Sequence, residues 1–236
     1  LPSGLMGADN QEPTVRPADP PGDPSGLARE PEEVGPEYRA LASDLHETVS
    51  GDVRFDEYAQ VLYATDGSIY QARPAGVVYP EDIADVRAAV RTAVDHGTPI
   101  LPRGAGSSLA GQTVGPGCVV LDMSRHMDGL LSVDPDEQTA TIQPGIVQDD
   151  LDDHLAEYGL KFAPDPASSN RSTVGGGIGN NSTGAHSVRY GITDAYTEEI
   201  KAVLSDGSVL HAREVVLDSD EYDGIVSKDD REAEIY

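Results

Sequence analysis

The sequence predicts an α+β protein, and three patterns lead to this prediction. An apolar run at 76–79, an amphipathic stretch at 81–96 and a second apolar run at 99–101 follow one another as strand, helix and strand, a βαβ-like unit. Asp206 and Gly207 separate two short apolar runs, which is typical of a β-hairpin turn. Two long glycine-rich stretches lie between these elements, and such stretches inside a domain are typical of binding surfaces.

Composition divides the chain into four parts. Residues 1–36 are rich in Pro, Gly, Asp and Glu and have almost no hydrophobic periodicity, which is typical of a disordered leader. Residues 37–72 form an N-terminal helical segment, and residues 73–216 hold the main domain. Residues 217–236 are acidic and poor in apolar side chains, so we predict no closing element there and interpret them as the start of a truncated following segment.

The individual elements follow from apolar spacing and from Gly and Pro breaks. Residues 37–50 have helical spacing, and residues 53–55 are interpreted as a turn before a second short helix at 57–63. The other predicted elements are strands at 118–121, 138–143, 199–204 and 208–211 and a helix at 146–158. His154 lies beside the apolar stripe of that helix and has no partner in the sequence, so it is interpreted as structural.

The first glycine-rich stretch, residues 102–112, follows a predicted strand directly. Its backbone can bend sharply, and its amides can converge on an anion such as a phosphate. It differs from a nucleotide-triphosphate loop because Gln112 stands where that loop needs lysine. It differs from the dinucleotide fingerprint because Leu109 replaces the third glycine and Gly115-Pro116 interrupts the helix that should follow. An ordinary turn between strands is the alternative.

The second glycine-rich stretch, residues 164–185, lacks the periodicity of a helix or a regular strand. Its glycines permit close approach, and its Ser, Thr and Asn side chains can form hydrogen bonds, which together suit a flat, polar, extended ligand. Disorder is the alternative, but ordered elements are predicted on both sides. Two phosphate-friendly stretches in one α+β domain could serve the two ends of one large cofactor.

The bulk composition restricts partners and location. The formal net charge is −26, with 42 acidic and 16 basic residues, which favours a salt-loving source and argues against nucleic acid as a partner. Cys118 is the only cysteine, so neither an internal disulfide nor a cysteine-based metal site is predicted. No signal peptide or membrane-spanning run is visible. We expect a cytoplasmic protein, with attachment to the inner face of the membrane through another component as the alternative.

Several motifs in order resemble one family. Residues 102–112 resemble the pyrophosphate loop of FAD-linked oxidases of the vanillyl-alcohol oxidase / p-cresol methylhydroxylase superfamily. The motifs that follow in that family's order are Gln143–Gly145, Pro164–Pro166, Val174–Gly176, Gly179–His186, Arg189–Gly191 and Asp206–Gly207. The resemblance covers roughly residues 50–215 and is nearest to the branch that holds glycolate oxidase (its D-type flavin subunit), D-lactate dehydrogenase and D-2-hydroxyglutarate dehydrogenase. Residues 109–112, 124–126 and 180–182 are similar to long fusion proteins with an iron–sulfur module after the FAD module.

The resemblance implies a two-subdomain FAD-binding fold of the p-cresol methylhydroxylase type at residues 73–216, with a small βαβ-like subdomain and a mixed sheet flanked by helices. It implies non-covalent FAD, because Ser107 occupies the place where some relatives hold a histidine for covalent attachment. The positions that it assigns to FAD are Pro102, Arg103, Gly104, Ala105, Gly106, Ser107, Ser108, Gly111, Gln112, Pro144, Gly145, Pro164, Ser168, Thr173, Val174, Gly175, Gly176, Gly179, Asn180, Asn181, Ser182, Gly184, Ala185, Tyr190 and Ile200.

The implied activity is that of an FAD-dependent dehydrogenase of D-lactate, glycolate or D-2-hydroxyglutarate, in which hydride passes from the substrate α-carbon to flavin N5. Electrons would pass to an iron–sulfur module on a longer chain or to a partner subunit. In relatives the substrate-binding domain lies beyond the matched region, so we assign no catalytic residue and no metal ligand, including at His186, and expect this segment alone to be inactive. An oxygen-using oxidase, a non-catalytic flavin-binding module and an acidic interaction protein are the alternatives.

Overall fold

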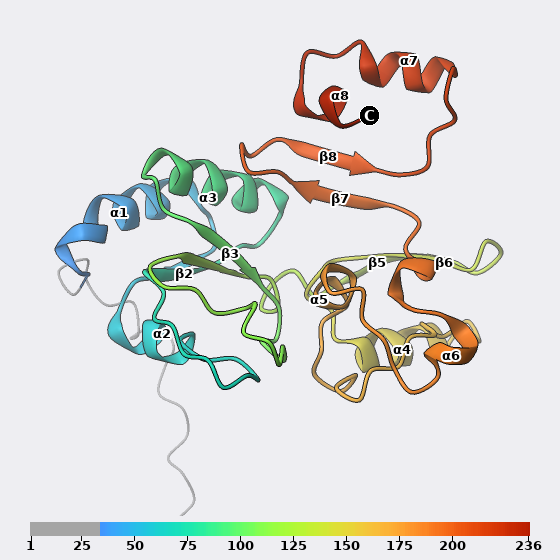
Figure 1. Ribbon diagram of the computed structural model, residues 1–236, viewed down its shortest axis with the longest axis horizontal. Helices are drawn as coiled ribbons and strands as arrows, with labels where there is room; N and C mark the ends of the chain where they lie inside the picture. The colour runs from blue at the N-terminus through green and yellow to red at the C-terminus, as the bar shows by residue number, and fades with distance from the viewer. Residues whose placement is uncertain (1–33) are drawn as a thin grey trace, which may run out of the picture. The chain divides into compact units, whose positions relative to one another are not determined.

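The computed structural model describes residues 34–236 (Figure 1). Most of the predicted leader, residues 1–33, lies outside the described residues. A short 3-10 helix, η3 (Pro36–Tyr38), opens the described part and leads directly into α1 (Arg39–Thr48). The strands that follow form a four-stranded sheet and two separate antiparallel pairs. This mixture of sheet and helix confirms the predicted α+β class.

The four-stranded sheet has the order β1-β2-β4-β3. Its parallel part consists of β2 (Gly76–Tyr79), β4 (Val119–Asp122) and β3 (Ile100–Arg103), with β4 in the centre. At its edge β1 (Asp52–Arg54) pairs antiparallel with β2. Because parallel strands end at the same edge of a sheet, the loops after β3 and β4 leave from one side.

Helices cover both faces of this sheet (Figure 1). On one face α1 packs with α3 (Ile83–Asp95) over a core that includes Leu45 and Leu121. On the other face the short helix α2 (Glu57–Leu62) lies over a smaller cluster built from alternate residues of the strands. The two inner strands, β2 and β4, are therefore buried on both sides, which agrees with their continuous apolar runs.

The start of α3 is tied to the chain before β1. Asp82 caps the helix by accepting the amides of Ala84 and Asp85 at 2.8 and 2.9 Å. The buried carboxylate of Asp85 accepts three further amides, those of Ser50 at 2.8 Å and of Gly51 and Glu81 at 3.0 Å each. Burial alone would raise the pKa of Asp85, but these backbone hydrogen bonds outweigh it and lower the pKa.

A separate core lies in the second half of the chain. Strands β5 (Leu130–Asp134) and β6 (Thr139–Ile142) form an antiparallel pair. The buried residues of this core come from helices α4 (Gln148–Ala156) and α5 (Val174–Gly179) and from the turn just before α4. The cluster consists of Ile146, Leu151, Leu155 and Val174, with half-buried residues of β5 and β6 against it. The two cores agree with the two subdomains that the resemblance implies.

The predicted hairpin is confirmed and lies against α3. Strands β7 (Ile200–Val203) and β8 (Val209–Ala212) pair antiparallel after two short helices, α6 (Ser187–Tyr190) and η4 (Thr193–Tyr196). Its turn residue Gly207 has a φ of +75°, which favours glycine. Arg87 and Arg91 of α3 donate to the Gly207 carbonyl at 3.0 and 3.3 Å, which fixes the tip of the hairpin.

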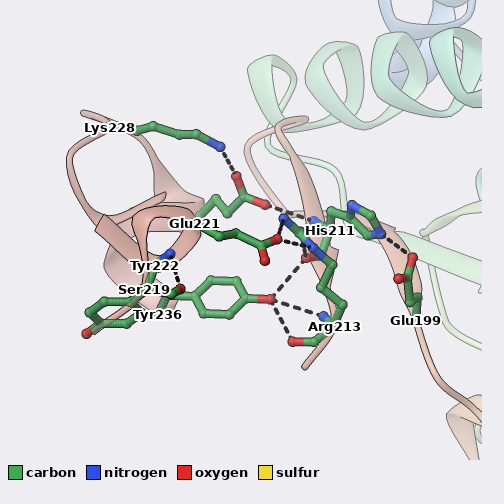
Figure 2. A network of polar contacts seen from close by, with 9 residues as sticks. Glu199, His211, Arg213, Ser219, Glu221, Tyr222, Lys228 and Tyr236 are labelled. Carbon is green, nitrogen blue, oxygen red and sulfur yellow. Dashed lines mark hydrogen bonds and ion pairs between the residues drawn. The ribbon is translucent and has the colours of Figure 1, made fainter. Parts of the chain in front are cut away.

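A polar network joins the C-terminal helices to β8 (Figure 2). These helices are α7 (Asp220–Val226), whose N-terminus is capped by Ser219, and α8 (Arg231–Ile235). The Tyr236 hydroxyl accepts the Arg213 amide at 3.0 Å and lies within 3.1 Å of the carbonyls of His211 and Arg213, to which it can donate. The network also contains the pairs Glu199–His211, Arg213–Glu221 and Lys228–Glu232.

The structure contains several elements that the sequence does not predict, among them the short helices α6 and η4. Residues 52–54 form the edge strand β1 where the sequence predicts a turn. Strand β5 at 130–134 is not among the predicted strands, and α5 at 174–179 occupies part of the stretch for which no helix is predicted. Helices α7 and α8 occupy residues after 216, where no closing element is predicted. Strand β1 is held by its pairing with β2, strand β5 by its pairing with β6, and α8 by its contacts with α7 and β8.

Candidate functional site

The first glycine-rich loop, residues 102–112, starts at the carboxyl end of β3. The last residue of that strand, Arg103, lies opposite Asp122 at the end of β4. Gly106 and Gly111 have φ values of +65° and +78°, a conformation that glycine adopts without strain. The loop remains half-buried or exposed, with Pro102 at the surface. It can therefore meet a ligand from outside.

The backbone of this loop presents a run of free donors. Within the described part of the chain, no backbone N–H group from Ala105 to Gln112 donates a hydrogen bond to another protein group. Its carbonyls are used instead: Gly106 accepts the Gly67 amide at 2.9 Å and Gly111 accepts the Val114 amide at 3.4 Å. A run of backbone amides without protein acceptors suits an anion such as a phosphate.

The two glycine-rich stretches meet, as their common assignment to one ligand requires. A Cβ at Gly104 would lie 2.0 Å from Thr173 Oγ1, so only glycine permits this approach. Ser107 Oγ lies 3.3 Å from Ser172 Oγ, which also contacts Ser168 Oγ. The side chains of Gln112 and Asn180 form a hydrogen bond of 2.8 Å. Hydroxyl groups, amides and glycines thus surround one region of the surface.

Pro144 and Gly145 lie beneath the second stretch. Gly145 donates to the Met127 carbonyl at 2.7 Å, and Gly175 donates to the Pro144 carbonyl at 2.9 Å. A Cβ at Gly175 would lie 2.6 Å from Pro144 Cβ, so the start of α5 rests against this turn. By contrast, a Cβ at Gly179 would meet nothing within 4 Å, and one at Gly176 would touch only Thr173 Oγ1, at 3.2 Å. The glycines at the end of α5 leave open space.

The ends of the second stretch also contact each other. Gly184 approaches Asp165 so closely that a Cβ there would lie 2.2 Å from the Asp165 carbonyl carbon. The Asp165 carboxylate accepts the His186 amide at 3.0 Å and pairs with His186 Nδ1, and these bonds lower the pKa of Asp165. Pro164 is buried, and its carbonyl accepts from Gln148 Nε2. Ala185 lies between Gly184 and His186 in this closed segment.

Four of the predicted positions lie outside these contacts. Asn181 exchanges two hydrogen bonds with Asp194, at 3.0 and 3.1 Å, and the Ser182 carbonyl accepts from Thr193 Oγ1 at 2.9 Å. The other two of these four positions are Tyr190 and Ile200. The Tyr190 carbonyl accepts from Tyr196 Oη at 2.6 Å, and Ile200 is the first residue of β7. No hydrogen bond or salt bridge within residues 34–236 joins these two residues to the loop at 102–112.

A third segment, residues 65–71, supports the loop and is not indicated by the sequence. Residues 65–68 suggest only a break between elements. In the structure Asp66 accepts the Ser68 amide at 2.8 Å and the Thr113 hydroxyl at 2.9 Å. Burial alone would raise the pKa of Asp66, but these hydrogen bonds lower it. An aspartate two residues before a serine is typical of a local turn, and this signal could have identified the segment as a defined loop.

The described residues contain neither a metal centre nor a membrane span. Among residues 34–236, no group of three or more His, Cys, Asp or Glu side chains could hold a metal ion. None of the helices described for the chain is long and apolar enough to cross a membrane.

Curated relatives are similar to this chain over most of its length. The D-2-hydroxyglutarate dehydrogenase of Escherichia coli K12 is 35% identical over 164 residues, which is 68% of this chain but 16% of that protein. The glycolate oxidase subunit GlcD of Bacillus subtilis 168 is 33% identical over 165 residues, 69% of this chain and 35% of that protein. The chain thus spans a minor part of the length of both relatives.

Solved structures agree with the fold. Alkyldihydroxyacetonephosphate synthase matches with a TM-score of 0.68 at 25% identity, covering 78% of this chain and 37% of the other. p-Cresol methylhydroxylase matches with a TM-score of 0.66 at 20% identity, covering 77% and 36%. This second likeness concerns the fold alone, and it confirms the fold of the p-cresol methylhydroxylase type.

The family model described as "FAD binding domain" matches residues 74–213, which include both glycine-rich stretches and the hairpin. The motifs at 102–112 and 164–185 indicate the same family, and their loops contact each other in the structure. The chain belongs to the family of FAD-binding domains found in FAD-linked oxidases, with D-2-hydroxyglutarate dehydrogenase and GlcD among its relatives.

Proposed function

We propose that this chain holds the FAD of a flavin-dependent 2-hydroxy-acid dehydrogenase, with the pyrophosphate on the loop at 102–112. The observation that supports this most is the run of backbone amides from Ala105 to Gln112, which have no acceptor among residues 34–236. This run lies where Gly104 touches Thr173 and Gln112 binds Asn180, so a second loop is ready to contact the rest of the same ligand. Amide donors and hydroxyl groups fit a pyrophosphate.

The roles of individual residues belong to the same proposal. The amides from Gly104 to Ser108 and the hydroxyls of Ser107 and Ser108 would bind the pyrophosphate. Pro144, Gly145 and Ile200 would lie on the adenine side. The remaining contacts, along the ribityl chain and the flavin, would come from Pro164, Ser168, Thr173, Val174, Gly175, Gly176, Gly179, Asn180, Asn181, Ser182, Gly184, Ala185 and Tyr190. Attachment would be non-covalent, since Ser107 cannot form the linkage that histidine forms in some relatives.

The reaction proposed is oxidation of a 2-hydroxy acid to a 2-keto acid. Bound FAD would accept the hydride of the substrate α-carbon. The residues of this chain would bind and orient the cofactor; removal of the hydroxyl proton and recognition of the carboxylate are assigned to no residue here. The names of the relatives support D-2-hydroxyglutarate and glycolate as substrate candidates, and D-lactate remains a prediction from the motifs. The electron acceptor, an iron–sulfur module or a partner subunit, and the cytoplasmic location are predictions as well.

Two measurements test the proposal. The 236-residue chain is titrated with FAD, and binding is followed by quenching of flavin fluorescence; we expect saturation at one FAD per chain. Acid precipitation should then release all flavin into the supernatant, whereas flavin in the pellet would contradict non-covalent binding. Failure to bind FAD would refute the function of this domain.

The reaction is tested on the complete gene product. We expect it to reduce an artificial dye with D-2-hydroxyglutarate, glycolate or D-lactate in the absence of oxygen. Turnover with oxygen but not with the dye would favour the oxidase alternative. FAD binding without turnover of any of these acids would favour a non-catalytic flavin-binding module.

A further inference from the structure

The guanidinium group of Arg103 lies at the base of the pyrophosphate loop and bonds to protein carbonyls. Nη1 donates to the carbonyl of Thr113 at 3.0 Å and, more weakly, to that of Tyr63 at 3.4 Å. Nη2 donates to the carbonyl of Thr65 at 2.9 Å. The group therefore joins both ends of the loop to the segment that follows α2, and it uses three donors on neutral acceptors.

Two further contacts close around the same group. Its central carbon lies 5.1 Å from the centroid of the Tyr63 ring, within the range of a cation–π contact. A Cβ at Gly106 would lie 2.3 Å from Nη2 and 2.8 Å from Nε of Arg103. The loop backbone therefore rests directly on the guanidinium, at a residue whose φ of +65° also favours glycine.

Tyr63 is itself fixed to the sheet. Its hydroxyl donates to the carboxylate of Asp122, the buried last residue of β4. Burial, and then this carboxylate, raise the pKa of Tyr63, so the hydroxyl stays protonated and remains a donor. The other oxygen of Asp122 accepts the amide and the hydroxyl of Ser124, at 2.8 and 2.7 Å. A continuous series of contacts thus runs from β4 through Tyr63 to Arg103 and the loop.

We propose that Arg103 is a positioning residue: it holds the loop in the shape that presents the amides of Ala105–Gln112, and Tyr63 and Asp122 position Arg103 in turn. This differs from the direct contact with FAD that the family resemblance assigns to Arg103. A lysine would keep the charge but offers a single nitrogen, so it cannot reach carbonyls on both sides of the loop or stack as a plane on Tyr63. The identity of the anion as FAD rests on the proposed function; the role in loop shape does not.

The test compares the wild-type chain with Arg103→Lys. Without FAD, hydrogen exchange is measured at the amides of Gly67 and Val114, which donate to loop carbonyls and so report its closure. We expect the variant to lose about ten-fold or more of their protection, because charged hydrogen bonds are lost, and to bind FAD about ten-fold or more weakly. Protection of α4 should not change. Arg73→Lys is the matched control, since Arg73 is exposed and pairs only loosely with Glu57, at 3.6 Å.

The outcomes separate the two proposals. Lost protection together with lost FAD affinity supports positioning. Retained protection with lost FAD affinity would indicate that Arg103 contacts FAD directly. Retained FAD affinity would show that the contacts of Arg103 with the carbonyls around the loop are not needed for binding. Either result overturns the inference. If Arg103→Lys does not fold, Tyr63→Phe replaces it: it keeps the ring and removes only the hydroxyl, and it should shift both readouts in the same direction by about three-fold. If the wild-type chain does not bind FAD, the proposed function is refuted, but the hydrogen-exchange data still test whether Arg103 holds the loop in shape.

Discussion

The contact between Gly104 and Thr173 offers a sharp test of how the two glycine-rich stretches form one site. In Gly104→Ala the new Cβ would lie 2.0 Å from Thr173 Oγ1, whereas an ordinary contact begins at 3.4 Å. Thr173 is buried, with 4% of its surface exposed, so its side chain has little room to move. The stretches must therefore separate by about 1.4 Å, the difference between these two distances. Overpacking of this kind costs about 1–3 kcal/mol.

We expect most of that cost to appear in FAD binding, because the loops can relieve the clash by moving apart when no ligand holds them. A loss of about 1–3 kcal/mol corresponds to roughly 5- to 150-fold weaker binding. FAD titration measures this loss of affinity. Urea unfolding of the flavin-free chain measures the part of the cost that lowers the free energy of unfolding. Unchanged FAD affinity would refute the proposed joint site.

Two further variants complete this experiment. Adding Thr173→Ala to Gly104→Ala removes the clashing hydroxyl and leaves the Thr173 Cβ 3.1 Å from the new methyl group, so we expect partial recovery of affinity. Thr173→Ala alone measures what the threonine contributes by itself. Gly224→Ala in α7 is the control, because a Cβ there meets nothing within 4 Å. It should leave FAD affinity unchanged and stabilise the chain by up to about 1 kcal/mol.

Three other changes have defined outcomes. Asp85→Asn leaves at least one of three backbone donors without its acceptor and should cost about 2 kcal/mol at pH 7 in urea unfolding. Because the folded pKa of Asp85 is lowered, this difference should persist above about pH 4, the unfolded value, and shrink as the pH falls further; a constant difference would contradict the assignment. Gln112→Ala, Asn180→Ala and the double variant form a double-mutant cycle for FAD affinity. We expect the two losses to be non-additive, with a coupling energy of about 0.5–1 kcal/mol, and additive losses would show that this hydrogen bond does not join the two stretches. Tyr236→Phe removes the hydroxyl that joins α8 to β8, about 1 kcal/mol of local stability, and should speed proteolysis within residues 213–236, while equal cleavage rates would contradict this role.

The elements predicted correctly are those whose pattern is local. Helix α3 shows a regular apolar spacing and an Asp82 cap, and the hairpin has its Asp206-Gly207 turn, so each could be recognised within one stretch. Strand β1 has only three residues and one buried side chain, Val53, and its pairing with β2 is invisible in the local sequence. Helix α5 consists mainly of glycines; its start is set by Val174, which is buried against Ile146 and Leu151 in the second core.

The sequence singles out the two glycine-rich stretches of the candidate site but does not indicate the contacts that join them. Gln112 argues against a nucleotide-triphosphate loop and is assigned to FAD through the resemblance, but nothing in the sequence indicates that its side chain binds Asn180, 68 residues away. Likewise, an arginine in a phosphate loop invites assignment as an anion ligand, and only the structure reveals its three carbonyl partners. Contacts between residues far apart in the sequence leave no local pattern.

The separation of the hydrophobic cores has a consequence for the way this chain unfolds. The core around the four-stranded sheet and the core of α4, α5 and β5–β6 share no buried residue, and the links between them near the site are polar groups and glycine contacts. We therefore predict that, without a ligand, each core melts as its own cooperative unit, at its own denaturant concentration. A ligand held by loops from both would bind only when both are folded, and mass action would then favour a single, steeper transition. FAD would thus couple the unfolding of the two cores, and the steepness of the unfolding transition would report how much of the chain has FAD bound.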